Sequence, residues 1–278
     1  RFNVDSAWEK PHARIAGEDG KIIEMNASKP ASRKWNFSMP VRLAASLLLL
    51  AILGVAVVTS TGKLQRITVA STNSENNRII DLPDGSRVYL NAGTKLSYSK
   101  KFGKNSRDIS LTGEAYFEVT PDKSKPFRIF AGNACVRVVG TAFNVNTRKS
   151  SGIVEVYVES GIVELSENGH QDNNVMLHPG NIGMIDHKSI IRSQAKNANP
   201  IAWKTGAMTF SDTPLVEVIA LLNNVYNVTI RVEGEGMDTI KINGSYQNDP
   251  LEDILRVIGE HNPQLTIAKS DDTIYLSQ

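Results

Sequence analysis

The chain has 278 residues, 41% of them hydrophobic, and a formal net charge of +2. This length suffices for about two domains with buried cores, and the lack of a Lys/Arg block argues against a nucleic-acid-binding protein. The single cysteine, Cys135, excludes an internal disulfide or a thiolate metal cluster, and we expect it to be a small buried side chain.

An uncharged run of twenty residues, LAASLLLLAILGVAVVTSTG, lies at positions 43–62. As a helix it would be about 30 Å long, which is the thickness of the hydrocarbon core of a membrane. A cleaved signal peptide is the alternative, but such a peptide normally lies within the first ~30 residues and has a shorter apolar stretch. We therefore predict a transmembrane helix at 41–62.

Basic residues are more numerous before this segment than after it, which favours a cytoplasmic N-terminal side. Those before it are Lys21, Lys29, Arg33, Lys34 and Arg42, and those within a similar distance after it are Lys63, Arg66 and Arg78. Residues 1–40 would then be cytoplasmic, and residues 63–278 would face the periplasm or the cell exterior. Because the chain begins with Arg1 and not Met, we also expect the native N-terminus to lie further upstream.

Apolar and polar residues alternate along several segments after the apolar run. Ala115, Phe117 and Val119 share one face of a strand, with polar or aromatic residues between them, and 153–159 repeats this pattern. Turn signals containing glycine or proline recur every eight to twelve residues. Half-buried strands at this spacing predict an all-β sandwich, roll or short β-solenoid for residues 63–199.

The stretch LPDGSRVYLNAGTKLSY at 82–98 admits a chemical and a structural interpretation. Ser86 could be a nucleophile assisted by Asp84, but such a serine needs a base that has its own orienting partner. No histidine lies in a motif that would place it beside Ser86 or in a metal-ligand spacing, so we expect neither a metal nor a cofactor. The five histidines are His12, His170, His178, His187 and His261. We interpret Asp84-Gly85 as a two-residue hairpin turn, with Ser86 starting the next strand.

A polar segment at 193–200 is typical of a linker. After it, a pattern at 210–222 recurs at 246–258: an aromatic strand end, a polar cap, proline, then leucine and an acidic residue. Each copy predicts a helix with Pro214 or Pro250 in its first turn. The candidate caps are Thr213 or Asp212 for the first helix and Asp249 or Asn248 for the second.

Strands are predicted on both sides of each helix, at 207–210, 228–232, 240–246, 264–267 and 273–276. Residues 200–278 therefore predict a small βαββαββ domain of the α+β class, with one sheet and both helices packed on one face. An exposed edge of such a sheet can dock a partner strand. The fold class of the whole chain is then mainly β plus α+β, with one transmembrane helix.

Five blocks keep their order between residues 82 and 165: LPDGSRVYLNAGTKLSY, LTGEAYFEV, PFRIFAG, VVGTAFNV and VESGIVEL. Together they resemble the FecR-type family of membrane-spanning anti-sigma regulators of Gram-negative bacteria. The repeat over 203–276 resembles the short domain at the N-termini of secretins and TonB-dependent transducers. Near the start, VDSAWEKPHARI resembles the end of a cytoplasmic anti-sigma segment, but Pro11 interrupts its helical spacing, so no sigma contact is assigned.

The resemblance implies a relay and not an enzyme. The signalling domain of an outer-membrane TonB-dependent transporter would contact the periplasmic C-terminal part of the chain, and the cytoplasmic segment would then release an ECF-type sigma factor. The chain would be a single-pass inner-membrane protein. The turn and packing positions implied by the family are Pro83, Asp84, Gly85, Gly113 and Gly140.

Some members of this family cut themselves at a Gly-Thr bond, and Gly140-Thr141 in VVGTAFNV matches that position. The hydroxyl of Thr141 would attack the carbonyl carbon of Gly140, and water would open the resulting ester. This chemistry needs a distorted peptide bond. The alternative is a glycine at a bulge or tight turn before a strand.

Two other classes of function are weighed against the relay. The chain would be a membrane-anchored periplasmic glycan-binding module if Tyr89, Tyr98, Tyr116 and Tyr157 are exposed and stack on sugars. A periplasmic hydrolase is the third class, but the sequence offers no matched set of base and nucleophile.

Overall fold

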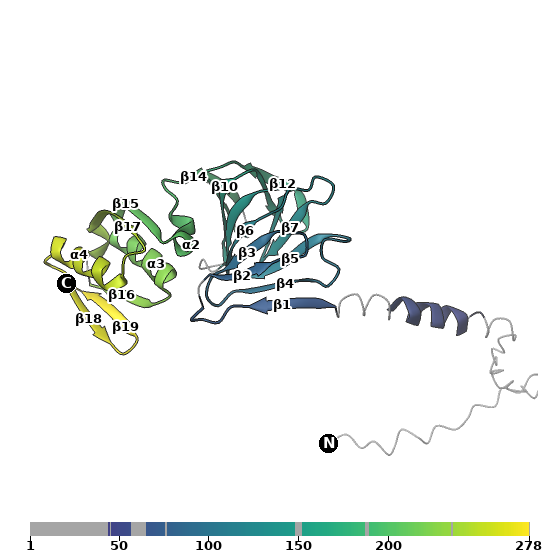
Figure 1. The fold of residues 1–278 in the computed structure, drawn as a ribbon, viewed down its shortest axis with the longest axis horizontal. Helices are drawn as coiled ribbons and strands as arrows, with labels where there is room; N and C mark the ends of the chain where they lie inside the picture. The colour runs from purple at the N-terminus through teal and green to yellow at the C-terminus, as the bar shows by residue number, and fades with distance from the viewer. Residues whose placement is uncertain are drawn as a thin grey trace, which may run out of the picture. The chain divides into compact units, whose positions relative to one another are not determined.

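The structure is a computed structural model that describes residues 44, 46–56, 65–75, 77–147, 152–186, 189–234 and 236–277. The chain divides into two compact units, Arg1–Val58 and Thr59–Gln278. In the first unit, residues 46–56 form a helix (Figure 1). Its large apolar side chains are exposed. No helix among the described residues is both long and apolar enough to cross a membrane. The predicted span at 41–62 and the predicted anti-sigma segment at 1–40 lie partly or wholly outside the described residues.

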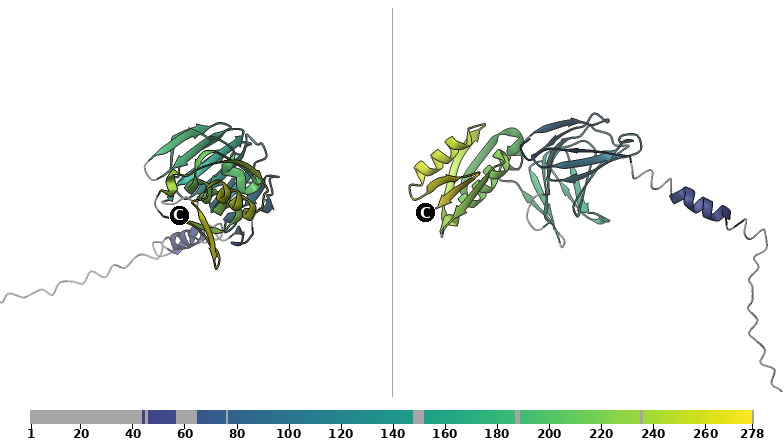
Figure 2. Two further views of the ribbon diagram at one scale, coloured as in Figure 1. Left: turned by 90° about the vertical axis from the view of Figure 1, so that its left-hand side faces the viewer. Right: turned by 90° about the horizontal axis from the view of Figure 1, so that it is seen from below.

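The part of the second unit that precedes residue 195 is a β-sandwich of two seven-stranded sheets (Figures 1 and 2). The first sheet has the order β1 (Arg66–Ala70), β4 (Lys95–Ser99), β5 (Arg107–Thr112), β7 (Phe127–Ala131), β8 (Ala134–Val138), β11 (Val163–Glu167) and β12 (His170–Leu177). The second has the order β14 (Ile190–Gln194), β13 (Asn181–Ile185), β10 (Val154–Ser160), β9 (Ala142–Asn146), β6 (Glu114–Glu118), β3 (Arg87–Leu90) and β2 (Arg78–Asp81). In the part of the sandwich that the structure describes, every strand pair is antiparallel except β5 with β7. Of the three predicted all-β architectures, the sandwich is confirmed.

The alternation of apolar residues produces the core between the two sheets. Phe117 of β6 and Phe143 of β9 stack with ring centroids 5.3 Å apart, and Phe127 of the opposite sheet meets Phe117 edge-on at 6.2 Å. All three side chains are fully buried. Such ring pairs contribute beyond the area that they bury. Cys135 is a buried free thiol, as predicted.

Arginines bridge the two sheets at both open sides of the sandwich. At one side, Arg78 of β2 donates to the carbonyl of Ala70 in β1 at 2.7 Å. At the other, Arg192 of β14 donates to the carbonyl of Met176 in β12 at 3.1 Å. Both arginines donate hydrogen bonds to backbone carbonyls of edge strands, which otherwise present unpaired polar groups.

The C-terminal domain has the predicted order of elements but two sheets instead of one. β15 (Ala207–Pro214) pairs with β17 (Lys241–Gln247), while β16 (Thr229–Glu233) pairs in parallel with β19 (Thr273–Ser277), which also pairs with β18 (Thr266–Ser270). The helices α3 (Leu215–Tyr226) and α4 (Leu251–His261) share one hydrophobic core with both sheets, and η4 (Met237–Thr239) joins it. The expected single sheet is wrong because β16 takes the C-terminal strand β19 as its partner, leaving β15 and β17 to each other.

The predicted side-chain caps of both helices are wrong. Pro214 and Pro250 themselves occupy the N-cap positions, in extended backbone conformations, and neither helix has a side-chain cap hydrogen bond. At α3 a neighbouring backbone replaces the cap, since the amide of Leu215 donates to the carbonyl of Ile240 at 2.9 Å. A strand that runs directly into a helix can satisfy the first amides without a polar side chain. The capping candidates that do not act as caps are Asp212, Thr213, Asn248 and Asp249.

Gly113 connects β5 to β6 at a point where no side chain fits. Its φ is +108°, and a Cβ atom there would lie 2.6–2.9 Å from atoms of Thr94. Gly169 also has a positive φ, +92°, but a Cβ atom there would meet nothing within 4 Å.

We therefore predict that Gly113→Ala lowers the free energy of unfolding by about 1–3 kcal/mol more than Gly169→Ala does. In both variants the positive φ strains the new alanine, and only in Gly113→Ala does the added Cβ atom also overlap with Thr94. Urea unfolding of the two variants measures the difference. Equal losses would show that the turn before β6 relaxes without cost.

Candidate functional site

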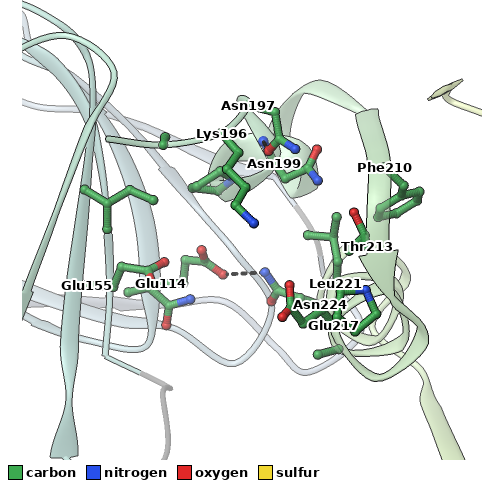
Figure 3. Close-up of a pocket in the computed structure, with 16 residues that line it drawn as sticks. Glu114, Glu155, Lys196, Asn197, Asn199, Phe210, Thr213, Glu217, Leu221 and Asn224 are labelled. Atoms are coloured by element: carbon green, nitrogen blue, oxygen red, sulfur yellow. Dashed lines mark hydrogen bonds between the residues drawn. The ribbon is translucent and has the colours of Figure 1, made fainter. Parts of the chain in front are cut away.

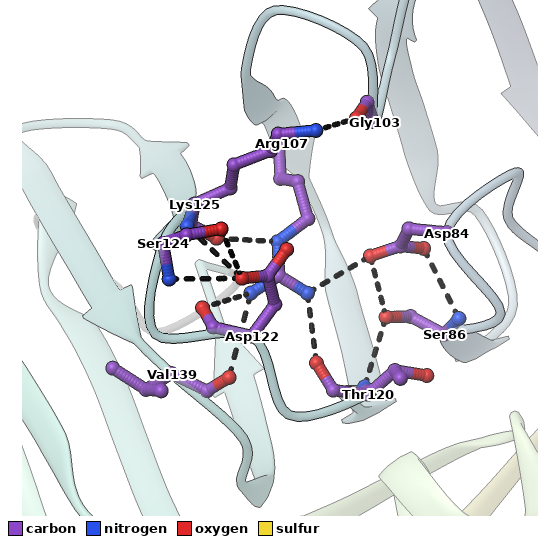
Figure 4. A network of polar contacts seen from close by, with 9 residues as sticks. All are labelled: Asp84, Ser86, Gly103, Arg107, Thr120, Asp122, Ser124, Lys125 and Val139. Carbon is purple, nitrogen blue, oxygen red and sulfur yellow. Dashed lines mark hydrogen bonds and ion pairs between the residues drawn. The ribbon is translucent and has the colours of Figure 1, made fainter.

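The Asp84-Ser86 pair is a structural turn (Figure 4). Asp84 accepts two hydrogen bonds from Ser86, one from its amide at 3.0 Å and one from its hydroxyl at 2.8 Å. The Ser86 oxygen also accepts the amide of Thr120 at 3.1 Å, and Ser86 is only 1% exposed. The buried Ser86 hydroxyl therefore holds the turn through these hydrogen bonds, in agreement with the structural interpretation of this stretch.

The predicted turn geometry, however, is wrong. β2 ends at Asp81 and β3 begins at Arg87, so the hairpin has a five-residue connection and Ser86 lies in it. Only Gly85 has a positive φ, +82°. The longer connection arises because Asp84 turns back onto Ser86 and toward Arg107, which a two-residue turn would not allow.

Arg107 is the centre of this network and was missed by the sequence analysis. It is 1% exposed and pairs with Asp84 at 3.1 Å (Figure 4). It lies over the ring of Phe127, 5.5 Å from the centroid. Its remaining donors reach the carbonyls of Lys125 (2.7 Å), Thr120 (2.8 Å), Asp122 (3.2 Å) and Val139 (3.4 Å). A signal was available, since Arg107 occupies the same inward register of β5 as Ile109 and Leu111.

Gly140 and Thr141 lie in the bend between β8 and β9. The Thr141 hydroxyl donates to the carbonyl of Ile162 at 3.0 Å, and Thr141 is 5% exposed. A Cβ atom on Gly140 would lie 2.8 Å from Pro121, so close packing explains the glycine. A hydrogen bond and close packing therefore give both residues a structural role, and self-cleavage stays a prediction.

The four tyrosines expected to be exposed are mostly buried. Tyr98 lies in the sandwich core beside Phe102, with centroids 5.4 Å apart. Tyr116 and Tyr157 point to the outer face of the second sheet, but they are 1% and 8% exposed because Trp203 and its neighbours cover them. The expectation of a tyrosine platform for sugars is wrong, because Tyr98 belongs to the core and Ile201 and Trp203 pack over Tyr116 and Tyr157.

The junction between the sandwich and the C-terminal domain is built by a segment that the sequence suggested was a linker. Its first residues complete β14, its end forms η3 (Asn199–Ile201), and the short helix α2 (Ala202–Thr205) follows directly. Trp203 in α2 is 4% exposed and donates its indole N–H to Asn144 of β9 at 3.2 Å. Residues 193–205, called the connector below, are therefore packed against the sandwich and are not a free linker.

Lys204 fixes the connector to the second sheet through its charge. Its Nζ lies 3.9 Å from the ring centroid of Tyr116 and 4.6 Å from that of Tyr89, with Glu118 Oε1 at 3.3 Å. Cation–π contacts strengthen when the partners are desolvated. Burial, followed by the hydrogen bond that Tyr116 donates to Glu159, raises the pKa of Tyr116 above its ordinary value, so this ring stays neutral.

Glu114, at the start of β6, ties helix α3 to the sandwich. Its carboxylate is 1% exposed and accepts three side-chain amides: Asn91 at 2.8 Å, Asn144 at 2.9 Å and Asn224 of α3 at 2.9 Å. A buried carboxylate is tolerated only when hydrogen bonds replace its hydration. The alternation of β6 correctly puts Glu114 on the outer face, but no pattern in the sequence indicated that α3 covers it.

A pocket of about 660 Å³ opens beside Glu114 at this junction (Figure 3). Its walls come from the second sheet, from the connector and from β15 and α3. As far as the structure describes it, the lining contains no histidine or cysteine. The described part of the chain also holds no cluster of three or more potential metal ligands.

Arg107 gives the clearest test of the scaffold. Arg107→Met should lower the free energy of unfolding by about 3–5 kcal/mol, because it leaves the buried Asp84 carboxylate without its charge partner. Arg128→Met is the matched control, since the Arg128–Asp108 pair is about one-third exposed and should contribute about 0–1 kcal/mol. Urea unfolding distinguishes the two, and similar losses would refute the central role of Arg107.

Two family models match this chain. Residues 68–164 match the model described as FecR protein, and residues 207–276 match the one described as FecR, C-terminal. The first match begins in β1 and ends in β11, so β12, β13 and β14 of the sandwich lie beyond it, while the second runs from β15 to β19 of the C-terminal domain. The finer resemblance to the N-terminal domain of secretins stays a prediction.

Two crystal structures of a protein described as "a putative anti-sigma factor from Parabacteroides distasonis" are similar to this chain, one at 2.50 Å and the other at 1.65 Å resolution. Each is 28% identical with a TM-score of 0.63; the alignments cover 77% and 76% of this chain and 99% and 98% of theirs. No curated protein matches the chain. The two family matches together cover more than half of the sequence and account for both folded domains, and the chain therefore belongs to the FecR family.

Proposed function

We propose that this chain is an anti-sigma regulator that relays a signal by protein–protein contacts. In this proposal an outer-membrane TonB-dependent transporter contacts residues 200–278, and the N-terminal segment holds or releases an ECF-type sigma factor. The family matches over both domains support an anti-sigma role, as does the similarity to the Parabacteroides protein. The transporter and the ECF type of sigma factor come from the resemblance of the sequence blocks.

One observation carries the proposal: the junction makes the two family domains a single compact body. Glu114 and Asn224 join them through a partly buried hydrogen bond, and Trp203 and Lys204 pack against the same sheet. A partner that binds one domain can influence the other only through differential contacts between bound and free states. This joint is where such a difference would be transmitted.

We further propose that the chain crosses the inner membrane once, with the N-terminus in the cytoplasm and the bulk in the periplasm. The described helix residues 46–56 support this, since they expose large apolar side chains on all sides. A lipid environment would remove that surface from water. The side chains concerned are Leu47, Leu48, Leu49, Leu50, Ile52, Leu53 and Val55.

Binding to the transporter is tested by calorimetry with the full chain in detergent and the isolated periplasmic signalling domain of its cognate transporter. We expect saturable one-to-one binding, and the cognate sigma factor should copurify with the full chain from cells. A signalling domain from an unrelated transporter is the control and should not bind. Binding without sigma copurification would contradict the anti-sigma half of the proposal, and the reverse result would contradict the transporter half.

Self-cleavage between Gly140 and Thr141 is a separate prediction. Attack by the Thr141 hydroxyl moves the acyl group of Gly140 from nitrogen to oxygen, and hydrolysis of the ester returns the hydroxyl and leaves a new carboxylate and amine. Mass spectrometry of the purified chain should then find fragments 1–140 and 141–278. Thr141→Ala should stay intact, whereas Thr141→Ser, which keeps a hydroxyl, should still cleave. An intact wild-type chain would contradict the prediction.

A further inference from the structure

We propose that the junction pocket binds a basic side chain, arginine or lysine, carried by a peptide segment of a partner protein. The proposed relay requires only that the two domains are joined, so it leaves the pocket without a function. Its size, its charge and its position across two domains point to this occupant.

The volume suits one long side chain together with the adjoining backbone. The pocket measures about 660 Å³, within the range of about 300–1,000 Å³ that is usual for ligand sites. Ile182, Phe210 and Leu221 supply apolar surface in its walls. Arginine and lysine bury their methylene stems against such surface while their charged ends reach polar groups.

The charges in the lining favour a cation. Three carboxylates line the pocket, those of Glu114, Glu155 and Glu217, against the single ammonium of Lys196 (Figure 3). Glu114 is 1% exposed, so a carboxylate is built into the wall by the fold itself. Glu217, in the first turn of α3, makes no hydrogen bond or ion pair among the described residues and is available to a ligand.

The occupant would contact both domains at once. Glu155 belongs to β10 of the sandwich, whereas Glu217 lies on α3 of the C-terminal domain. Binding to the joined state alone stabilises that state by mass action. Occupancy therefore strengthens the same junction that Glu114 and Asn224 already hold, and a partner segment could use it to bias the relay.

The test uses the full chain in detergent and a tripeptide, N-acetyl-Leu-Arg-Leu-amide, with a counterpart in which citrulline replaces arginine. Citrulline keeps the shape of arginine and removes its charge. Calorimetry should find the citrulline peptide about three- to fivefold weaker, the size expected for one partly exposed ion pair. The arginine peptide should also raise the thermal unfolding midpoint of the chain.

Two variants locate the site. Glu217→Gln should weaken the arginine peptide by a similar factor and leave the citrulline peptide unchanged. Glu252→Gln removes an exposed carboxylate from the first turn of α4, outside the pocket, and should change neither. The thermal unfolding midpoint without peptide shows whether a pocket substitution has unfolded the chain. In that case Lys196→Ala gives a second readout, because removing the single ammonium group of the lining should strengthen binding of the arginine peptide.

Several outcomes would overturn the inference. Equal affinities for the arginine and citrulline peptides would remove the role of charge, and an unaltered affinity in Glu217→Gln would place the site elsewhere. Agmatine binding as tightly as the peptide would indicate a small-amine site and not a peptide site. No saturable binding at about 1 mM peptide would also refute it. None of these results depends on the transporter or the sigma factor, so the proposed relay is judged separately.

Discussion

The arrangement of the two folded domains depends on one buried carboxylate. Removing a charge from water is costly unless other groups take over its hydration. Glu114 meets that requirement with amides from the end of β3, from β9 and from α3 of the C-terminal domain. The third donor, Asn224, exists at this place only when the domains are docked. The burial of Glu114 and the docking of the C-terminal domain are therefore one event.

The same face of the second sheet carries the other contacts of the junction, and they depend on this docking too. Tyr116 and Tyr157 lie under the connector, Lys204 sits over the ring of Tyr116, and Trp203 reaches Asn144. Aromatic rings, an ammonium group and amides allow the interface to be directional without a large apolar area. Such an interface fits a regulator whose domains must be joined firmly and still respond to a partner.

Away from the junction, the turn-rich stretch that first suggested catalysis serves to close the sandwich. Asp84, Ser86 and Thr120 hold the five-residue turn, and Arg107 connects it to four carbonyl groups of neighbouring loops. A planar guanidinium with five donors is suited to such a position, because it can serve several acceptors at fixed angles. Two of the five groups that accept hydrogen bonds from this buried arginine, Asp84 and Val139, therefore lie in sequence blocks that resemble the FecR family.

Periodicity and turn residues alone were sufficient to predict an all-β domain with several of its strands, the two C-terminal helices and a turn at Asp84 and Ser86. These are local properties, because the spacing of apolar and polar residues along the sequence indicates which side of a strand or helix is apolar. What lies opposite the polar side depends on contacts between residues far apart in the chain. For that reason only the tertiary structure decided that Glu114 and Tyr116 are covered, that Arg107 pairs with Asp84 inside the protein, and that β16 pairs with β19 to make a second small sheet. It also decided that strand β15 leads straight into α3, which made a side-chain cap unnecessary because a neighbouring carbonyl receives the first amide.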